Sequence, residues 1–127
     1  MYSIILISND NFGNSLKKEL RKRKFKMFFS SKPKPGLDKA KTKRPDILII
    51  NYVFKGSFML FDMIKEIRSD STLKNSLVFI LSENKDEFDK VLAIELGADE
   101  YMVKPVDINQ ILFKLKCLLR YKKNILH

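Results

Sequence analysis

The sequence predicts an α/β fold in which helices cover both faces of a parallel β-sheet. Five short apolar runs alternate with longer stretches that have the spacing of amphipathic helices. Two of these runs, residues 47–50 and 77–81, show no polar alternation, which is typical of strands buried on both faces. With 127 residues, 45% of them hydrophobic, the chain has the size and apolar content of one doubly wound globular domain.

The predicted strands are residues 2–8, 26–30, 47–51, 77–82 and 100–103. After the first strand, Phe12, Leu16 and Leu20 recur at four-residue spacing, which predicts a helix with one apolar face. The second helix is the weakest, because residues 37–43 are few and mostly charged. Residues 32–36 contain two prolines and a glycine, so we expect an extended or turning loop there.

Three further helices follow the third, fourth and fifth strands. Their apolar positions are Leu60, Met63, Ile64 and Ile67 in the first of them, Phe88, Val91, Leu92 and Leu96 in the second, and Ile108, Ile111, Leu112, Leu115, Leu118 and Leu119 in the last. Gly97 stands just past the second of these helices, where glycine commonly ends a helix. Asp107 is expected to cap the last helix, with Gln110 three residues on as in a capping box.

No linker, internal repeat or low-complexity block divides the chain, so we expect one domain over residues 1–123, with 124–127 as a tail or the start of a linker. No signal peptide is recognisable, and no apolar run approaches the ~20 residues that span a bilayer, so we expect a cytoplasmic location and no membrane partner. Cys117 is the single cysteine, which excludes an internal disulfide, and we expect it in the core or at an interface.

Polar residues stand at the predicted strand ends. In an open α/β sheet, ligands bind at the carboxyl ends of the strands, near the point where the strand order reverses. We therefore expect one crevice to collect the residues at these ends, namely Ser8, Asn9, Asp10, Asn51, Ser82 and Lys104.

The most specific pattern in the chain is Gly-Ala-Asp-x-Tyr-x-x-Lys-Pro at residues 97–105, directly before the last helix. With this string and with residues 4–10, 44–51, 64–68 and 78–82, the chain resembles the receiver domain of two-component response regulators over essentially its whole length. The resemblance implies the flavodoxin-like receiver fold, a five-stranded parallel sheet of order 2-1-3-4-5 flanked by five helices. It also implies a role in phosphorelay signal transduction.

In this family an aspartate at the end of the third strand accepts the phosphoryl group, and the matching residue is Asn51. An amide is not nucleophilic and does not form an acyl phosphate, so the phosphorylation chemistry is expected to be absent. The family's Mg²⁺ ligands correspond to Asn9, Asp10 and Asn51, of which one is a carboxylate. We therefore expect a weak or absent metal site at Asp10 and no other cofactor. The alternative for Asp10 is a helix or turn cap.

Other features of the family pocket are retained. By resemblance, Ser82 corresponds to the hydroxyl residue that contacts the phosphoryl group, and Tyr101 to the aromatic switch residue. The alternative for Ser82 is a turn residue. Lys104 corresponds to the lysine that pairs with the phosphoryl group, and in a crevice it needs a counter-charge, for which Asp10 is the expected partner. Pro105 is expected to follow a cis peptide bond, as in the family.

Two departures surround this pocket. Residues 52–58 are bulky and apolar, and Glu83 stands where the family has a small residue, so a charged side chain is expected to block or reshape the entry. We therefore interpret the chain as an atypical receiver, a pseudo-receiver that acts as a phosphorylation-independent interaction or regulatory module and not as an enzyme. The alternative is a working phosphorelay receiver whose acceptor site is altered or engineered.

The resemblance also implies a contact face, formed by the fourth helix, the fifth strand and the fifth helix. Its expected partners are other signalling proteins, a fused output domain, or a second copy in a homodimer. The candidate contact residues are Lys90, Ile94, Tyr101, Lys114 and Arg120.

The net charge of +10 is unevenly distributed. Residues 17–44 contain 13 basic residues against Glu19 and Asp38, which leaves 12 basic and 13 acidic residues elsewhere. The simplest interpretation is a solvated lysine-rich face. The alternative is an electrostatic binder of nucleic acid or of an acidic partner, less favoured because no nucleic-acid motif accompanies the charge. Its candidate residues are Lys17, Lys18, Arg21, Lys22, Arg23, Lys24 and Lys26.

Overall fold

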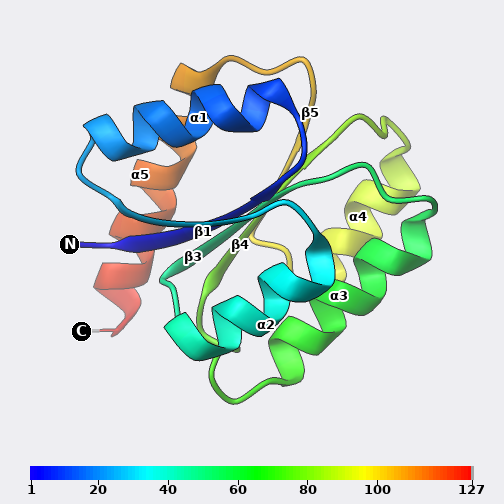
Figure 1. Ribbon diagram of the computed structural model, residues 1–127. Helices are drawn as coiled ribbons and strands as arrows, with labels where there is room; N and C mark the ends of the chain where they lie inside the picture. Colours follow the sequence, from blue (N-terminus) through cyan, green and yellow to red (C-terminus); the bar gives the residue numbers. More distant parts are fainter. Residues whose placement is uncertain (127) are drawn as a thin grey trace.

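Five parallel strands form one sheet in the computed structural model, which describes residues 1–126 and, at residues 57 and 123–126, the backbone alone. The sheet has the order β2-β1-β3-β4-β5, with β1 (Ser3–Ser8), β2 (Lys26–Ser30), β3 (Ile47–Asn51), β4 (Leu77–Ser82) and β5 (Glu100–Val103) (Figure 1). The helices are α1 (Asn11–Lys22), α2 (Pro33–Lys43), α3 (Ser57–Ser69), α4 (Glu87–Leu96) and α5 (Ile108–Leu126). The predicted fold class and strand order are confirmed.

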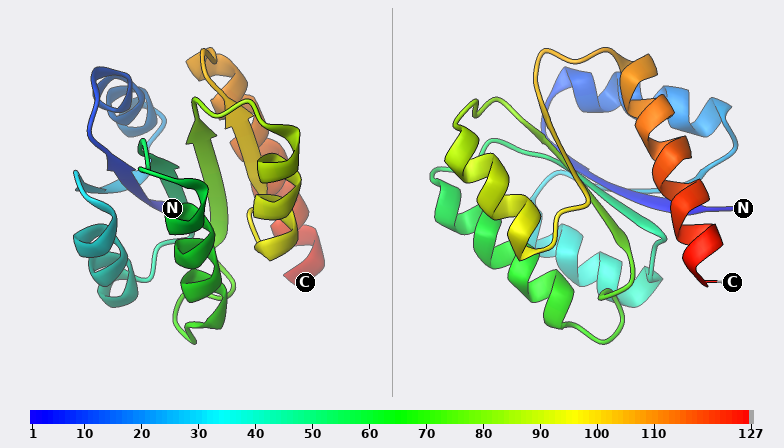
Figure 2. Two further views of the ribbon diagram at one scale, coloured as in Figure 1. Left: turned by 90° about the vertical axis from the view of Figure 1, so that its right-hand side faces the viewer. Right: turned by 180° about the vertical axis from the view of Figure 1, so that it is seen from behind.

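Helices α1 and α5 cover one face of the sheet, and α2, α3 and α4 cover the other (Figures 1 and 2). Because successive strand side chains point to opposite faces, Ile4 and Leu6 of β1 pack under α1 and α5, whereas Ile5 packs on the other side. All three are fully buried. Burial on both faces explains why the strand sequences lack polar alternation.

Helix α2 begins at Pro33, so the predicted loop over residues 32–36 is wrong. The first N–H groups of a helix have no partner inside the helix, so Pro33 and Pro35 in the first turn remove no hydrogen bond, and their φ angle suits a helix. Gly36 lies where α2 approaches β1, because a Cβ there would be 2.7 Å from Ile7 Cδ1. The glycine that looked like a loop signal is required by close packing.

The ends of the chain differ slightly from the predicted boundaries. Strand β1 begins at Ser3 and not at residue 2.

The capping box of α5 is confirmed: the Asp107 carboxylate accepts from the Asn109 N–H at 2.8 Å, and the Asp107 N–H donates to Gln110 Oε1 at 3.1 Å. Residues 124–126 continue α5, so no break in the helix marks the expected boundary, and residue 127 lies outside the described residues. No helix in the described part of the chain is both long and apolar enough to cross a membrane.

Helix α4 buries less of its apolar surface than its spacing predicts. Leu92 and Leu96 pack against the core, but Phe88 is 73% exposed and Val91 is 55% exposed. Helix α4 is the last helix of its layer and packs beside α3, so its outer side has no neighbouring helix to cover it (Figure 2). Cys117 is exposed on α5, so of its two predicted places the core is wrong and the interface stays a prediction.

Arg68, at the end of α3, forms hydrogen bonds with the segments that precede β4 and β5. Its guanidinium donates to the Gly97 carbonyl at 2.6 and 2.9 Å and to the Asp99 carboxylate at 2.8 Å. It also donates to the carbonyls of Lys74 and Ser76, at 3.0 and 2.7 Å. Gly97 ends α4 with a φ of 130°, and a Cβ there would lie 2.5 Å from Arg68 Cγ. One side chain therefore ties the turn after α4 to the loop before β4.

Candidate functional site

A polar cluster of four side chains, Ser8, Asp10, Asn51 and Lys104, lies at the carboxyl ends of the strands. Strands β1 and β3 pair with Ser8 opposite Asn51, so the two strands end side by side. Asp10 caps α1, because its carboxylate accepts from the Gly13 N–H at 2.9 Å. Lys104 directly follows β5, the edge strand, and its side chain extends to Asp10 and Asn51 at the ends of β1 and β3.

Asn51 is the buried centre of the polar cluster, with 1% of its surface exposed. Its side-chain NH₂ donates to Ser8 Oγ at 2.9 Å and to Asp10 Oδ1 at 2.8 Å. Its carbonyl oxygen accepts from Lys104 Nζ at 2.7 Å. The reversed amide would set NH₂ against an ammonium and oxygen against a carboxylate, so the surroundings favour one orientation. Asn51 is therefore held in place by bonds to both sides of its amide.

Lys104 and Asp10 form an ion pair beside Asn51, with Nζ 2.9 Å from Oδ2 and side chains 13% and 37% exposed. Burial by itself would raise the pKa of Asp10, but the hydrogen bonds from Gly13, Lys104 and Asn51, together with the positive charge of Lys104, outweigh it and hold that pKa below its ordinary value. Lys104 Nζ also lies 5.5 Å from the centre of the Phe12 ring. The lysine is thus compensated within the domain.

Gly13 is a site residue that the sequence patterns did not reveal. A Cβ at this position would lie 1.8 Å from Ser8 Oγ and 3.4 Å from Asn51 Nδ2. The first turn of α1 therefore packs directly on the polar cluster, and only glycine leaves the room. A glycine three residues after the capping Asp10 was the available signal, since glycine in a helix costs stability unless close packing requires it.

The donors of the polar cluster do not suit Mg²⁺ in this arrangement. Asp10 is its one carboxylate, and both oxygens already accept hydrogen bonds, from Gly13 and Asn51 on one side and from Lys104 on the other. Mg²⁺ generally needs carboxylates or phosphate oxygens that are free to coordinate it. Asn9 is exposed and does not join the cluster. Over the described residues, no group of three acidic, histidine or cysteine side chains forms a candidate metal site.

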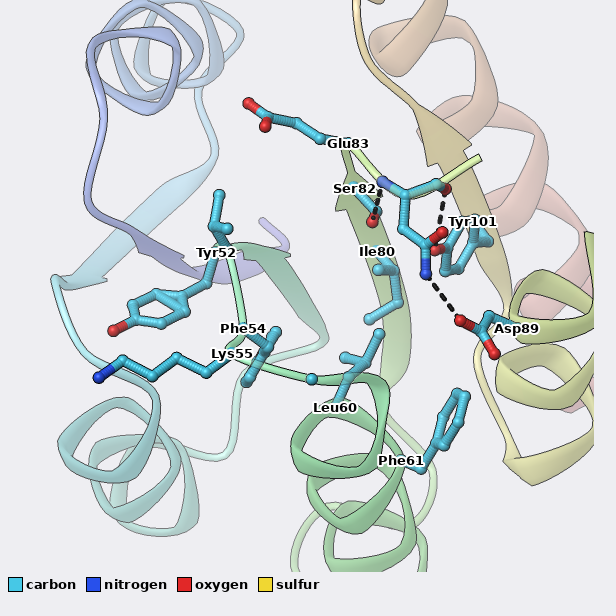
Figure 3. Close-up of a pocket in the computed structure, with 13 residues that line it drawn as sticks. Tyr52, Phe54, Lys55, Leu60, Phe61, Ile80, Ser82, Glu83, Asp89 and Tyr101 are labelled. Carbon is cyan, nitrogen blue, oxygen red and sulfur yellow. Dashed lines mark hydrogen bonds between the residues drawn. The ribbon is translucent and has the colours of Figure 1, made fainter. Parts of the chain in front are cut away.

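A cavity of about 300 Å³ lies between the segment after β3, the end of β4 and the start of α4 (Figure 3). The apolar part of the cavity wall is formed by Phe54, Leu60 and Ile80. Ser82, at its edge, accepts a hydrogen bond from the Asn84 backbone N–H at 3.0 Å. The Ser82 hydroxyl therefore supports the turn after β4.

Tyr101 lines the same cavity and is buried, with its hydroxyl donating to the Asn84 carbonyl at 3.3 Å. Its expected place among the surface contact residues is therefore wrong. Glu83 is exposed, and its carboxylate points away from the interior of this cavity (Figure 3). Glu83 also lines a second pocket, which contains Asp10 and Lys104, so its predicted position at the entry to the polar cluster agrees with the structure. The peptide bond between Lys104 and Pro105 is cis, as the resemblance implies.

The other predicted surface residues lie on two opposite sides of the sheet order. On α4 and α5, Ile94, Lys114 and Arg120 are exposed and Lys90 is partly exposed. Lys114 Nζ lies 3.6 Å from Glu100 Oε2 of β5. Near β2, the exposed basic residues are Lys18, Arg21, Lys22, Arg23, Lys24 and Lys26, and Lys17 is partly buried.

Comparison with known proteins gives relatives in one family. Response regulator ArlR of Staphylococcus saprophyticus is 27% identical over 121 residues, which are 94% of this chain and 53% of that protein. ArlR of Staphylococcus epidermidis is 28% identical over 121 residues, with the same coverage of 94% and 53%. The chain therefore spans about half the length of these curated relatives.

Solved structures share the fold. A two-component response regulator from Clostridium difficile superposes with a TM-score of 0.82 at 17% identity, over 94% of this chain and 97% of that one. The chemotaxis response regulator CheY4 of Vibrio cholerae gives a TM-score of 0.78 at 19% identity, over 91% and 97%. The family model of the response regulator receiver domain matches residues 5–116, and the chain belongs to that family.

Proposed function

We propose that this chain is a phosphorylation-independent receiver, a signalling module that regulates a partner through protein contacts without accepting a phosphoryl group. The observation that carries the proposal is Asn51, which ends β3 at the position where the family has its acceptor carboxylate. An amide nitrogen shares its lone pair with the carbonyl, so Asn51 offers no nucleophile for phosphoryl transfer.

The contacts of Asn51 support the proposal further. Lys104, the residue that would meet a phosphoryl group, is neutralised by Asp10 at 2.9 Å and bound by the Asn51 carbonyl at 2.7 Å. An incoming phosphoryl group would have to break both contacts and would find no acceptor. The polar cluster therefore favours one fixed arrangement in place of a switch.

We place the partner contact on the face formed by α4, β5 and α5. Phe88, Val91 and Ile94 form an exposed apolar stripe on α4, and Phe113 of α5 is exposed as well. Exposed apolar side chains that gather on one face are typical of interaction sites. Sedimentation analysis of the chain and of a Phe88→Ser, Val91→Ser double variant tests self-association through this face. The matched control is Phe58→Ser, a more exposed residue of α3 away from it.

The test of phosphorylation independence is an amide NMR titration with Mg²⁺ and then with beryllofluoride, which mimics a phosphoryl group. We expect no saturable shifts around Asn51 in the unmodified chain. The matched variant is Asn51→Asp, and a receiver that keeps its acceptor aspartate serves as the positive control. Saturable shifts at Asp10, Asn51 and Ser82 in the unmodified chain would contradict the proposal and favour a working receiver with an altered acceptor site.

A further inference from the structure

We propose that the β2 edge of this domain binds the phosphate backbone of nucleic acid without reading base sequence. The surface, called here the β2-edge surface, is built around four lysines of the basic segment 17–44 that contact β2 or lie on it, namely Lys17, Lys26, Lys39 and Lys43. It lies at the opposite end of the sheet order from the α4 and β5 contact face, because β2 and β5 are the two outermost strands. The proposal is therefore independent of the proposed receiver function.

Three lysines from three different elements converge on two consecutive residues of β2. Lys17 Nζ of α1 lies 4.5 Å from the centre of the Phe29 ring. Lys26 Nζ of β2 and Lys43 Nζ of α2 lie 5.6 and 5.5 Å from the centre of the Phe28 ring. The two rings point to opposite faces of the sheet. The ammonium groups therefore flank the sheet edge on both sides.

Most of the charge on the β2-edge surface has no acidic partner within the described structure. Of the 13 basic residues in the segment, Lys22 pairs with Glu19, and Lys41 pairs with Glu66 and Asp70. For the remaining 11 of these 13, the described residues provide no ion pair. A concentration of one sign of charge attracts polyanions and speeds their association. The charge pattern is therefore suited to a polyanionic partner.

The surface lacks the apolar anchors that a protein or membrane partner would need. None of the large apolar side chains described as exposed lies between residues 17 and 44. Protein interfaces are depleted in lysine and use aromatic and aliphatic anchors, whereas nucleic-acid interfaces are polar and strongly basic. Membrane-surface helices likewise bury an apolar face. The composition of this surface therefore favours the phosphate backbone.

Strand addition by an acidic peptide is disfavoured by Lys39. Its Nζ donates to the Phe29 carbonyl of the edge strand at 2.9 Å, which occupies an acceptor that an added strand would use. Lysines along an edge strand are a recognised protection against such pairing. The edge presents cations to a partner and covers its backbone.

Base stacking is not available on this surface, which sets the expected mode of binding. Phe25, Phe28 and Phe29 are partly buried and pack against the two cores, so no ring is free to receive a base. Contacts to phosphates alone give binding that is independent of sequence and strongly dependent on salt. A surface that neutralises about five phosphates would lose roughly 500-fold in affinity between about 50 and 200 mM salt.

Fluorescence anisotropy with a short mixed-sequence DNA duplex tests the proposal on the whole chain across this salt range. The test variant is Lys17→Gln, Lys26→Gln, Lys43→Gln, and the matched control is Lys65→Gln, Lys85→Gln, Lys116→Gln, whose residues are exposed away from the β2 edge. We expect the test variant to reduce the slope of log affinity against log salt by about 2.7, since each phosphate contact contributes about 0.9. We expect the control to follow the unmodified chain, and thermal melting confirms that both variants fold.

Three results would overturn the proposal. The first is no binding of the duplex at the lowest salt concentration. The second is an equal loss in both triple variants, which would mean that net charge alone is responsible. The third is binding of polyglutamate or of vesicles containing anionic lipid in preference to the duplex, which would assign the surface to an acidic protein or to a membrane.

Discussion

Lysines stand in two contrasting electrostatic situations in this domain. Lys104 is 13% exposed, and its ammonium bonds a carboxylate and an amide oxygen of the polar cluster. Lys26 and Lys43 are exposed at the β2 edge and lie over the Phe28 ring, with no carboxylate described beside them. The first arrangement neutralises the charge internally and fixes a conformation. The second leaves the charge free to interact with molecules outside the domain.

This contrast predicts that stability depends on the polar cluster and very little on the β2 edge. Removing one partner of a partly buried ion pair leaves the other charge unpaired, which lowers the free energy of unfolding. Removing an exposed charge usually changes the free energy of unfolding by less than about 0.5 kcal/mol. Substitutions in the two regions therefore separate a structural role from a binding role.

The largest effect is expected for Gly13→Ala. The added methyl group would overlap Ser8 Oγ and press on Asn51, so α1 and the ends of β1 and β3 would have to move apart. We expect a loss of about 3 kcal/mol in the free energy of unfolding, measured by urea denaturation. Gly56→Ala is the matched control, because a Cβ there meets nothing within 4 Å. An equal loss in both variants would contradict the close approach at Gly13.

A smaller loss is expected for Lys104→Met. The substitution keeps the unbranched apolar part of the side chain but removes the ammonium, which leaves the Asp10 carboxylate without its cation and the Asn51 carbonyl without its donor. We expect a loss of about 2 kcal/mol, below the usual range for buried pairs because Asp10 is partly hydrated. Lys26→Met is the control and should change stability by less than about 0.5 kcal/mol. Comparable losses in the two variants would remove the distinction between the regions.

The smallest effect is expected from the charge of Asp10 and is seen as a dependence on pH. Because the pKa of Asp10 is lowered in the folded chain, its ionised form stabilises the fold above the pKa of the unfolded chain, near 4. That contribution is lost as the pH falls through the lowered pKa of the folded chain. Asp10→Asn should therefore be less stable than the unmodified chain at pH 7, by less than about 1 kcal/mol because solvent screens the partly exposed carboxylate, and the two should converge in strong acid.

Urea denaturation at a series of pH values measures this difference. Asp62→Asn, an exposed residue of α3, is the control for a general effect of removing one carboxylate. Equal stability of Asp10→Asn and the unmodified chain at every pH would show that Asp10 acts by capping α1 alone, because asparagine caps a helix about as well as aspartate does.

Sequence patterns predicted the sheet well because burial on both faces leaves a strong signal. Residues 47–51 and 77–82 were assigned correctly as β3 and β4, since no polar residue interrupts their apolar runs. The strand-end residues Asp10, Asn51 and Lys104 could also be predicted to meet, because parallel strands end at one edge of the sheet.

Patterns failed where tertiary neighbours decide the outcome. Phe88 and Val91 have helical spacing, but spacing does not show that α4 is the outermost helix of its layer. Pro33 by itself indicates a loop, but proline in the first turn of a helix leaves its hydrogen bonding intact. Gly13 gave no periodic signal, since its role depends on how closely α1 approaches Ser8.

The anchoring of Gly97 by Arg68 makes the two ends of α4 unequal. The end of α4 near Gly97 is tied through the guanidinium to the carbonyls of Lys74 and Ser76, so it cannot shift without breaking several hydrogen bonds at once. The opposite end near Phe88 is bonded to the exposed turn before it, through Asn84 and Asp86. A partner that binds Phe88 would therefore act on the end of α4 that Arg68 does not anchor.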